Sequence, residues 1–287
     1  MKLSCLLPLL LLLFTGRVCA TTIVAVKTPL EIVIGADSKM TDTFGGGVGN
    51  QGCKIVQAGS LFFAYEGLAR DRRSGFDIVK IAAAALALRP QATPAERVSI
   101  MTGFITSRLF AELPELKRHD PDTYREKVEG GRTFLKILVA GFEGNQPLLF
   151  VRGFRAAPLS GQMIGVSVLP DDCLADCGAA VSVRMLGETA AIEGLPEETD
   201  GFWSGGIAQG VRRLIETEIA ARSEYVGPPV DILRIDRAAA RWLQKKQGCP
   251  AIENRRQPQR QTSPRSRRSV SLKMRLRPLV GRLRPPV

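Results

Sequence analysis

Short segments that alternate apolar and polar residues occur in pairs along this chain, and they constrain its fold more than any other feature. Each pair flanks a short turn sequence, which predicts a β-hairpin. The first four segments predict two hairpins, over residues 22–28 with 31–37 and residues 53–57 with 60–66. Later segments predict strands over residues 133–142, 147–154, 162–169, 180–186 and 229–236.

Three stretches have the 3.6-residue periodicity of amphipathic helices: residues 70–88, 94–113 and 205–225. The order is therefore two hairpins, two helices, more hairpins, a helix and a strand. Strands joined by short turns pair antiparallel, whereas parallel strands need a long crossover connection between them. The sequence predicts an α+β fold in which helices cover antiparallel sheets.

The first twenty residues, 1–20, have the layout of a secretory signal peptide. A basic start precedes an apolar run over residues 6–14, and Val18 and Ala20 fit a cleavage point after Ala20. The run is shorter than the about 20 residues of a membrane span. We therefore expect an exported protein, periplasmic or secreted, with Thr21 as its mature first residue. A retained anchor, and an internal start or propeptide, are the alternatives.

Charge divides the rest of the chain into a body, residues 21–250, and a tail, residues 251–287. The tail carries eleven Lys or Arg residues and one acid, Glu253, so most of the formal net charge of +12 lies there. Its composition offers too little apolar surface to offset the entropy of ordering it, and we expect it to be disordered. Its charge would attract anionic surfaces, but it has no aromatic residues for specific recognition of nucleic-acid bases.

Four cysteines remain once the leader is removed: Cys53, Cys173, Cys177 and Cys249. An exported protein can keep disulfides, and four cysteines allow three pairings. The close pair Cys173 and Cys177 is the favoured bridge, although helical geometry there would strain it. A metal site is not expected, because zinc sites with two cysteines need further cysteine or histidine ligands nearby.

His119 is the only histidine of the chain and lies in a charged, turn-like stretch, KRHDPD. We expect a solvated side chain there, so any chemistry must proceed without an imidazole base. Residues 47–52 match the pattern G-x-G-x-x-G, but the next segment predicts a strand and not the helix that a dinucleotide site requires. No cofactor is therefore expected.

Thr21, as a first residue, would carry its own base. A threonine hydroxyl is a weak nucleophile until a base takes its proton, and a free α-amine can serve because its pKa is about 7.7–8.0. Asp37, which ends the second predicted strand, and Lys54, near the start of the third, would lie beside the first strand in a paired sheet. Gly67 follows the fourth strand, where a glycine lets a substrate carbonyl approach a backbone N–H.

These residues and their order resemble the β-type proteasome subunits and their bacterial relatives among the N-terminal nucleophile (Ntn) hydrolases. TTIVAVKTPLEIVIGADSKMT is similar to the start of that family, and CKIV and FFAYEGLARD are similar to the segments that follow. VAGFEGNQPLLFVRGF resembles the family's central hairpin, and YVGPPVDILRI resembles its last strand. The likeness covers roughly residues 21–237.

The resemblance implies a four-layer αββα sandwich of two antiparallel sheets flanked by helices. It implies that Thr21 is the nucleophile and, through its amine, the base. It also implies that Asp37 and Lys54 tune this nucleophile and that the Gly67 amide stabilises the oxyanion. The activity would be hydrolysis of a peptide or other amide bond through an ester on Thr21. Assembly of the chain with copies of itself is left open.

Some features depart from the family's pattern. Lys54 lies one residue farther from the nucleophile than is usual. Where the family has a Ser, an Asp and a further Ser that assist the nucleophile, residues 187–189 read Gly-Glu-Thr and residues 223–227 read Ser-Glu-Tyr-Val-Gly. An export leader is also foreign to the cytosolic members. Two alternatives therefore stand beside the hydrolase: a non-catalytic assembly or binding subunit, and a transpeptidase or ligase that uses the same acyl-enzyme.

Overall fold

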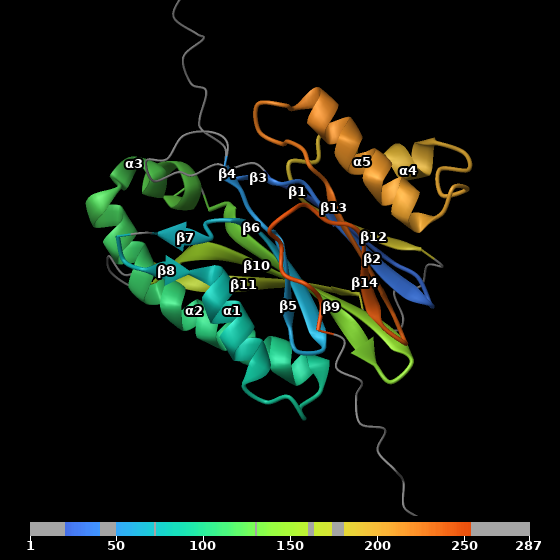
Figure 1. The fold of residues 1–287 in the computed structure, drawn as a ribbon. Coiled ribbons are helices and arrows are strands. Elements are labelled where there is room, and N and C mark those ends of the chain that lie inside the picture. The colour runs from blue at the N-terminus through green and yellow to red at the C-terminus, as the bar shows by residue number, and fades with distance from the viewer. Residues whose placement is uncertain are drawn as a thin grey trace, which may run out of the picture. The chain divides into compact units, whose positions relative to one another are not determined.

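Two five-stranded antiparallel sheets lie at the centre of this computed structural model (Figure 1). The structure describes residues 21–40, 50–71, 73–129, 131–159, 164–173 and 181–253. These residues belong to one unit of the chain, Met1–Arg255, which is followed by a second unit, Arg256–Val287. Several regions for which the sequence makes predictions lie outside the described residues, among them the leader, residues 47–49 of the G-x-G-x-x-G stretch, Cys177 and nearly all of the basic tail.

The first sheet contains the strand that follows Thr21, and its strand order is β12-β1-β2-β13-β14. Its strands are β1 (Thr22–Lys27), β2 (Glu31–Ala36), β12 (Ser182–Gly187), β13 (Asp231–Asp236) and β14 (Ala240–Gln244). The predicted hairpin of β1 and β2 is confirmed, with Ile23 paired to Ala36. β1 has a partner strand on each side, and all six of its residues are buried.

The second sheet has the strand order β11-β10-β9-β6-β5. Its strands are β5 (Ile55–Ala58), β6 (Leu61–Gly67), β9 (Thr133–Glu143), β10 (Gln146–Pro158) and β11 (Ile164–Cys173). The predicted hairpins of β5 with β6 and of β9 with β10 are confirmed. Two short ladders extend the loops, β3 (Lys39–Met40) with β4 (Asn50–Gln51) and β7 (Arg70–Asp71) with β8 (Phe76–Asp77).

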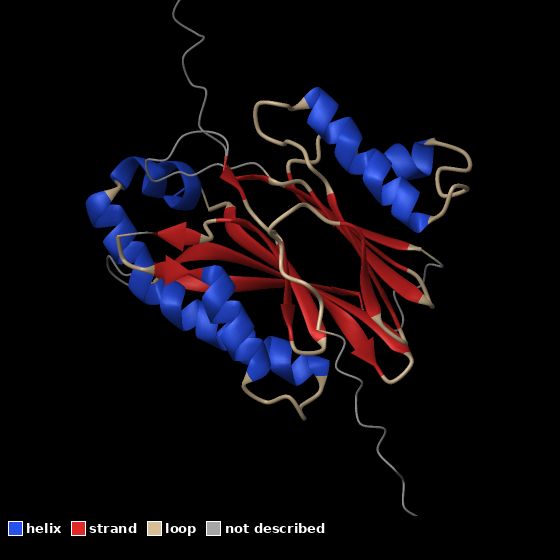
Figure 2. Ribbon diagram, viewed as in Figure 1, coloured by secondary structure: helices blue, strands red, loops and turns tan. Residues whose placement is uncertain are grey.

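Three helices cover the outer faces of these sheets (Figure 2). α1 (Ile78–Ala87) and α2 (Pro94–His119) contact the second sheet, and α5 (Ile207–Ala221) contacts the first. Shorter helical segments are α3 (Pro121–Tyr124), a π-helical turn (Arg125–Glu129) and α4 (Leu195–Glu198). None of the helices in the described ranges is long and apolar enough to cross a membrane.

Each sheet buries apolar side chains on both of its faces. Ile34 of the first sheet and Phe62 of the second belong to one buried cluster, so the two sheets pack face to face. Phe63, the next residue of β6, points to the opposite face and packs with Met101 of α2. Val24 of β1 likewise belongs to the cluster that α5 covers. The prediction of an α+β fold with helices on antiparallel sheets is confirmed.

The first predicted helix, over residues 70–88, begins eight residues later than expected. Arg70–Asp71 and Phe76–Asp77 instead pair as the β7–β8 ladder, and Gly75, just before β8, has a φ of 76°. The Asp77 carboxylate then caps α1 by accepting hydrogen bonds from the N–H groups of Val79, at 3.0 Å, and Lys80, at 3.3 Å. An aspartate at this position satisfies amides that have no partner inside the helix, which explains why α1 begins at residue 78.

Two strands that are neighbours in the sequence lie in different sheets. β11 pairs with β10 in the second sheet, whereas β12 pairs with β1 in the first. Periodicity predicts both strands but not their partners, because alternation identifies a buried face and not the strand that pairs with it. This crossing between sheets brings β12 beside the start of β1. The last strand, β14, was not predicted from the sequence.

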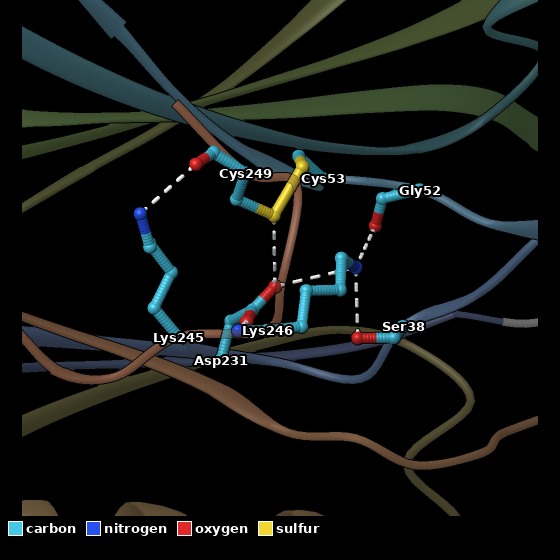
Figure 3. The surroundings of a disulfide bond; sticks show 7 residues. All are labelled: Ser38, Gly52, Cys53, Asp231, Lys245, Lys246 and Cys249. Atoms are coloured by element: carbon cyan, nitrogen blue, oxygen red, sulfur yellow. Dashed lines mark hydrogen bonds and ion pairs between the residues drawn. A yellow bond between two sulfur atoms is a disulfide. The ribbon is translucent and has the colours of Figure 1, made fainter. Parts of the chain in front are cut away.

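A disulfide joins Cys53, the residue before Lys54, to Cys249 near the end of the described chain (Figure 3). Residues 245–253, called the C-terminal strap below, follow β14. The strap reaches the edge strand of the second sheet, where Gln57 and Glu253 exchange two hydrogen bonds of 2.8 Å. The predicted bridge between Cys173 and Cys177 stays a prediction, because Cys177 lies outside the described residues.

Candidate active site

The peptide group between Thr21 and Thr22 is held where β12 passes the start of β1. The Thr21 carbonyl oxygen accepts a hydrogen bond from the Glu188 N–H at 2.8 Å. Gly187, which pairs with Thr22, has a φ of 87°, and a Cβ at that position would lie 1.6 Å from the Thr21 carbonyl oxygen. A side chain at residue 187 would therefore displace the start of β1.

Thr22 is fully buried, and its hydroxyl, its N–H and its carbonyl all have partners. Its hydroxyl donates to the Glu188 carbonyl at 2.7 Å, and its N–H donates to Asp37 Oδ1 at 2.9 Å. A buried hydroxyl that already donates to a carbonyl is poorly placed to act as a nucleophile. Of the two threonines, Thr21 is the half-buried one and remains the candidate.

Asp37 is the polar centre of the site. Its carboxylate is fully buried. One oxygen, Oδ1, accepts hydrogen bonds from both Lys54 Nζ, at 2.6 Å, and the Thr22 N–H. The other oxygen, Oδ2, accepts from the N–H groups of Lys39, at 3.0 Å, and Gly227, at 3.2 Å. Four donors from four segments of the chain thus offset the cost of burying this charge.

Lys54 is brought beside the Thr21–Thr22 peptide by its contact with Asp37. The Lys54 ammonium and the Thr22 nitrogen both contact Asp37 Oδ1, so the two nitrogens are no farther apart than the sum of those two contacts. The Thr22 nitrogen is itself bonded to the Thr21 carbonyl carbon. The structure therefore brings together Asp37, Lys54 and the backbone that carries Thr21.

Burial decides the direction in which the pKa of Lys54 is shifted. Its side chain is 1% exposed, and removal from water lowers the pKa of its amine, while the negative charge and hydrogen bond of Asp37 oppose that change. The nearby Lys246 lowers the pKa of Lys54 further by repulsion. A lysine with a lowered pKa in contact with a buried carboxylate is typical of functional sites, although structural ion pairs also shift pKa values.

Gly67 is the last residue of β6, a strand that contacts β1. Its φ is 94°, and a Cβ there would lie 2.2 Å from the Phe134 carbonyl oxygen. The next N–H, of Leu68, donates to that same carbonyl at 2.8 Å. Only a glycine fits this backbone, which turns away from β9 at the end of the β6–β9 ladder.

The two segments at which the sequence departs from the pattern that it resembles, residues 187–189 and 223–227, reach the site through their backbones. Gly227 donates its N–H to Asp37 and accepts the N–H of Ser38 at 3.0 Å. Lys39 Nζ donates to the carbonyls of Ser223, at 2.7 Å, and Glu224, at 2.8 Å. These contacts could not be predicted from the sequence, because any residue could supply the carbonyl and N–H groups involved.

Glu188 also contributes its backbone to the site, through the bonds to Thr21 and Thr22 described above. Its side chain instead forms an ion pair, with one carboxylate oxygen 3.7 Å from Arg222 Nε. The side chain of Glu188 is 20% exposed and that of Arg222 is 44% exposed. An ion pair with this exposure contributes little to stability. Glu188 therefore acts on the site through its peptide group.

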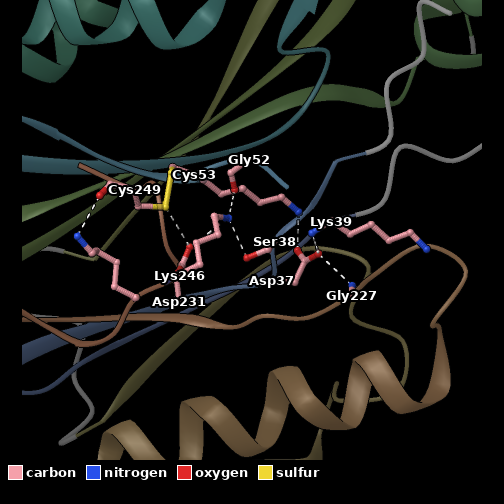
Figure 4. A network of polar contacts seen from close by, with 11 residues as sticks. Asp37, Ser38, Lys39, Gly52, Cys53, Gly227, Asp231, Lys246 and Cys249 are labelled. Atoms are coloured by element: carbon pink, nitrogen blue, oxygen red, sulfur yellow. Dashed lines mark hydrogen bonds and ion pairs between the residues drawn. A yellow bond between two sulfur atoms is a disulfide. The ribbon is translucent and has the colours of Figure 1, made fainter. Parts of the chain in front are cut away.

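A second buried Lys–Asp pair, which sequence analysis did not identify, adjoins the first (Figure 4). Lys246 Nζ lies 3.3 Å from Asp231 Oδ2, and their side chains are 4% and 1% exposed. The same ammonium donates to Ser38 Oγ at 2.8 Å and to the Gly52 carbonyl. Asp231 lies within the predicted strand over residues 229–236 and is the first residue of the observed β13. Lys246 lies beyond every predicted element, so the sequence offered no reason to pair the two residues.

His119 is not the solvated residue that the sequence predicts. It ends α2 and not a turn, and its side chain is only 20% exposed. Its Nε2 lies 2.9 Å from Oδ2 of the buried Asp71 on β7. Burial alone would raise the pKa of Asp71, but hydrogen bonds from the Arg73 N–H, Glu112 and His119 outweigh it and hold that pKa below its ordinary value. The contact ties the end of α2 to β7.

Within the ranges that the structure describes, no group of three or more His, Cys, Asp or Glu side chains could hold a metal ion. The polar groups at the candidate site instead pair with one another, as carboxylate with ammonium and carbonyl with N–H.

Comparisons with known proteins do not identify the chain. No model of a known protein family matches it, and no curated protein matches it. The functional conclusion therefore depends on the geometry above and on the resemblance of its N-terminal motifs.

Proposed function

We propose that this chain is an exported N-terminal threonine hydrolase of the Ntn type, formed when cleavage after Ala20 frees the amine of Thr21. The observation that carries the proposal is the buried Asp37 carboxylate, which accepts the Lys54 ammonium and the Thr22 N–H on one oxygen. Burying an ion pair costs several kcal/mol per ion in desolvation, so its place beside the first peptide of β1 calls for a functional reason.

The layers of the fold support the finer part of this proposal, the four-layer αββα sandwich of Ntn hydrolases. α1 and α2 cover one sheet, α5 covers the other, and the two sheets pack face to face between them. β1, which would carry the nucleophile at its first end, lies inside this arrangement and contacts β6 of the facing sheet. A rigid strand is a suitable support for a reacting group, since small displacements reduce the rate strongly.

In the proposed reaction, the Thr21 amine takes the proton of the Thr21 hydroxyl, and the hydroxyl oxygen attacks the carbonyl carbon of a peptide or other amide bond. The Lys54 ammonium favours the negative charge that develops on the hydroxyl oxygen, and the Gly67 N–H donates to the oxyanion. The ammonium of Thr21 then gives its proton to the leaving amine as the C–N bond breaks. Water, deprotonated by the same amine, hydrolyses the resulting ester and releases the acid.

The first test is the mature N-terminus, read by intact mass and N-terminal sequencing of the exported protein. We expect a chain that starts at Thr21. An electrophile that reacts with both an amine and a hydroxyl on one residue should form a single adduct with this protein, and Thr21→Ala should abolish it. Thr102→Val is the control, because it removes a threonine hydroxyl on α2, which donates to the Val98 carbonyl at 2.7 Å outside the site, and it should leave the adduct in place.

Retention of residues before Thr21, or an adduct that survives Thr21→Ala, would contradict the proposed function. The adduct also separates catalysis from the second candidate, an assembly or binding subunit with the same fold. One observation favours that candidate: the segments at Glu188 and Gly227 supply backbone groups where the family has assisting side chains. A mature chain that begins with Thr21 but forms no adduct and cleaves no peptide would support it.

A further inference from the structure

The Asp37–Lys54 contact joins two stretches of chain that lie side by side. After Asp37, Ser38 accepts the N–H of Gly52 on its carbonyl at 3.1 Å, and the β3–β4 ladder continues this pairing. Gly52 is two residues before Lys54. The distance between carboxylate and ammonium is therefore set by how the stretch after Asp37 is held against the stretch before Lys54.

Lys246 binds both of these stretches with one ammonium group. Its Nζ donates to the Ser38 hydroxyl on one side and to the Gly52 carbonyl on the other, and Asp231 neutralises its charge (Figure 4). Asp231 Oδ1 also accepts the Lys246 N–H at 2.7 Å, so the lysine backbone is fixed as well as its side chain. A buried ammonium with three acceptors is held rigidly, because moving away from any acceptor would leave a buried polar or charged group without its partner.

We propose that Lys246 is a positioning residue that fixes the contact between Asp37 and Lys54. Nothing in its contacts brings it to the reacting atoms, and it acts through Ser38 and Gly52. The inference rests on the proposed function for its effect on the reaction rate, but the geometry that it fixes can be measured without any activity.

The C-terminal strap delivers Lys246 to this place. Cys249, three residues on, forms the disulfide with Cys53, and its sulfur lies 3.7 Å from Asp231 Oδ2. The strap is thus attached covalently to the residue that precedes Lys54 (Figure 3). Lys245 points elsewhere and donates to the Cys249 carbonyl, and it is exposed. Both lysines belong to the strap, but only Lys246 is buried and reaches the site.

The experiment compares Lys246→Met with Lys245→Met in the full exported chain. The first readout is the rate of adduct formation at Thr21, and the second is the NMR titration of the Lys54 side-chain nitrogen and its adjacent carbon. We expect Lys246→Met to slow the adduct by about tenfold to a hundredfold, the cost of a small misplacement of a reacting group. Lys245→Met should stay within about twofold of the wild type.

The titration has an expected direction as well. The charged groups that face Lys54 are Asp37, Lys246 and Asp231. Removal of Lys246 takes away a repelling cation and leaves Asp231 without its partner, so the pKa of Lys54 should rise in Lys246→Met and stay unchanged in Lys245→Met.

A double variant separates positioning from the effect of an unpaired carboxylate. Lys246→Met with Asp231→Asn removes both charges, and replacing a buried pair by neutral residues is often tolerated. The double variant should fold and still react slowly. Wild-type adduct rates in the single and double variants, with the Lys54 resonances unchanged, would overturn the proposal. If the wild-type protein forms no adduct, the proposed function fails, and the Lys54 resonances alone decide whether Lys246 positions the pair.

Discussion

Asp37→Asn is the substitution whose effect the structure defines best. Asparagine keeps the shape of the side chain but has no negative charge, and one of its two acceptor oxygens becomes an NH₂ donor. Four donors now converge on this carboxylate, and at least one of them would face another donor in the variant. The Lys54 ammonium, 1% exposed, would lose its counter-ion.

The magnitude follows from the burial of the pair. Removing one partner of a buried ion pair costs about 3–5 kcal/mol, because the remaining charge is left uncompensated. For a domain of this size each kcal/mol lowers Tm by about 2–4 °C. Asp37→Asn should therefore lower Tm by between about 6 and 20 °C and abolish the adduct at Thr21.

Chemical denaturation followed by tryptophan fluorescence measures this change in the free energy of unfolding. Asp122→Asn is the matched control, because Asp122 pairs with Arg125 at 2.9 Å but both side chains are exposed, at 88% and 67%. The control should change stability by no more than about 1 kcal/mol. Equal and small effects of the two substitutions would refute the reasoning, since burial would then contribute nothing to the strength of the first pair.

Three further predictions concern the surroundings of the pair. Gly67→Ala should destabilise the fold by about 1–3 kcal/mol, because its φ is 94° and a carbonyl oxygen occupies the space of a Cβ. Gly144→Ala, in a turn where a Cβ meets no other atom, should destabilise the fold less in the same denaturation assay. Burial lowers the pKa of Lys54 below its ordinary value of about 10.4, so the folded state binds fewer protons than the unfolded state between those two pKa values. The stability of the wild type relative to Lys54→Met should therefore rise with pH across that window, and a fall would contradict the assignment. Replacing Cys53 and Cys249 together by serine should cost about 2–5 kcal/mol, measured against the wild type with and without a reducing agent.

Local patterns predicted the elements that depend on local chemistry. The hairpin of β1 and β2 was predicted because alternation and a short turn are properties of neighbouring residues. Asp37 and Lys54 do flank strands as predicted, but the strand after Lys54, β5, lies in the second sheet and not in the sheet of β1, so the pair forms between the two sheets. The start of α1 was predicted eight residues too early. The helical periodicity extends upstream of Asp77, and the pattern alone does not show that Asp77 caps the helix. His119 was misplaced for a related reason, since a charged segment can end a long helix as easily as it forms a turn.

By itself the sequence determined the fold class, the order of most strands and helices, and which threonine, aspartate, lysine and glycine to examine. Only the tertiary structure decided that β12 lies beside Thr21, that Gly227 supports Asp37, and that Lys246 and Cys249 close the network from the far end of the chain. The reason is the separation along the chain: Cys53 and Cys249 are 196 residues apart, and only the packing of the two sheets brings such distant groups into contact.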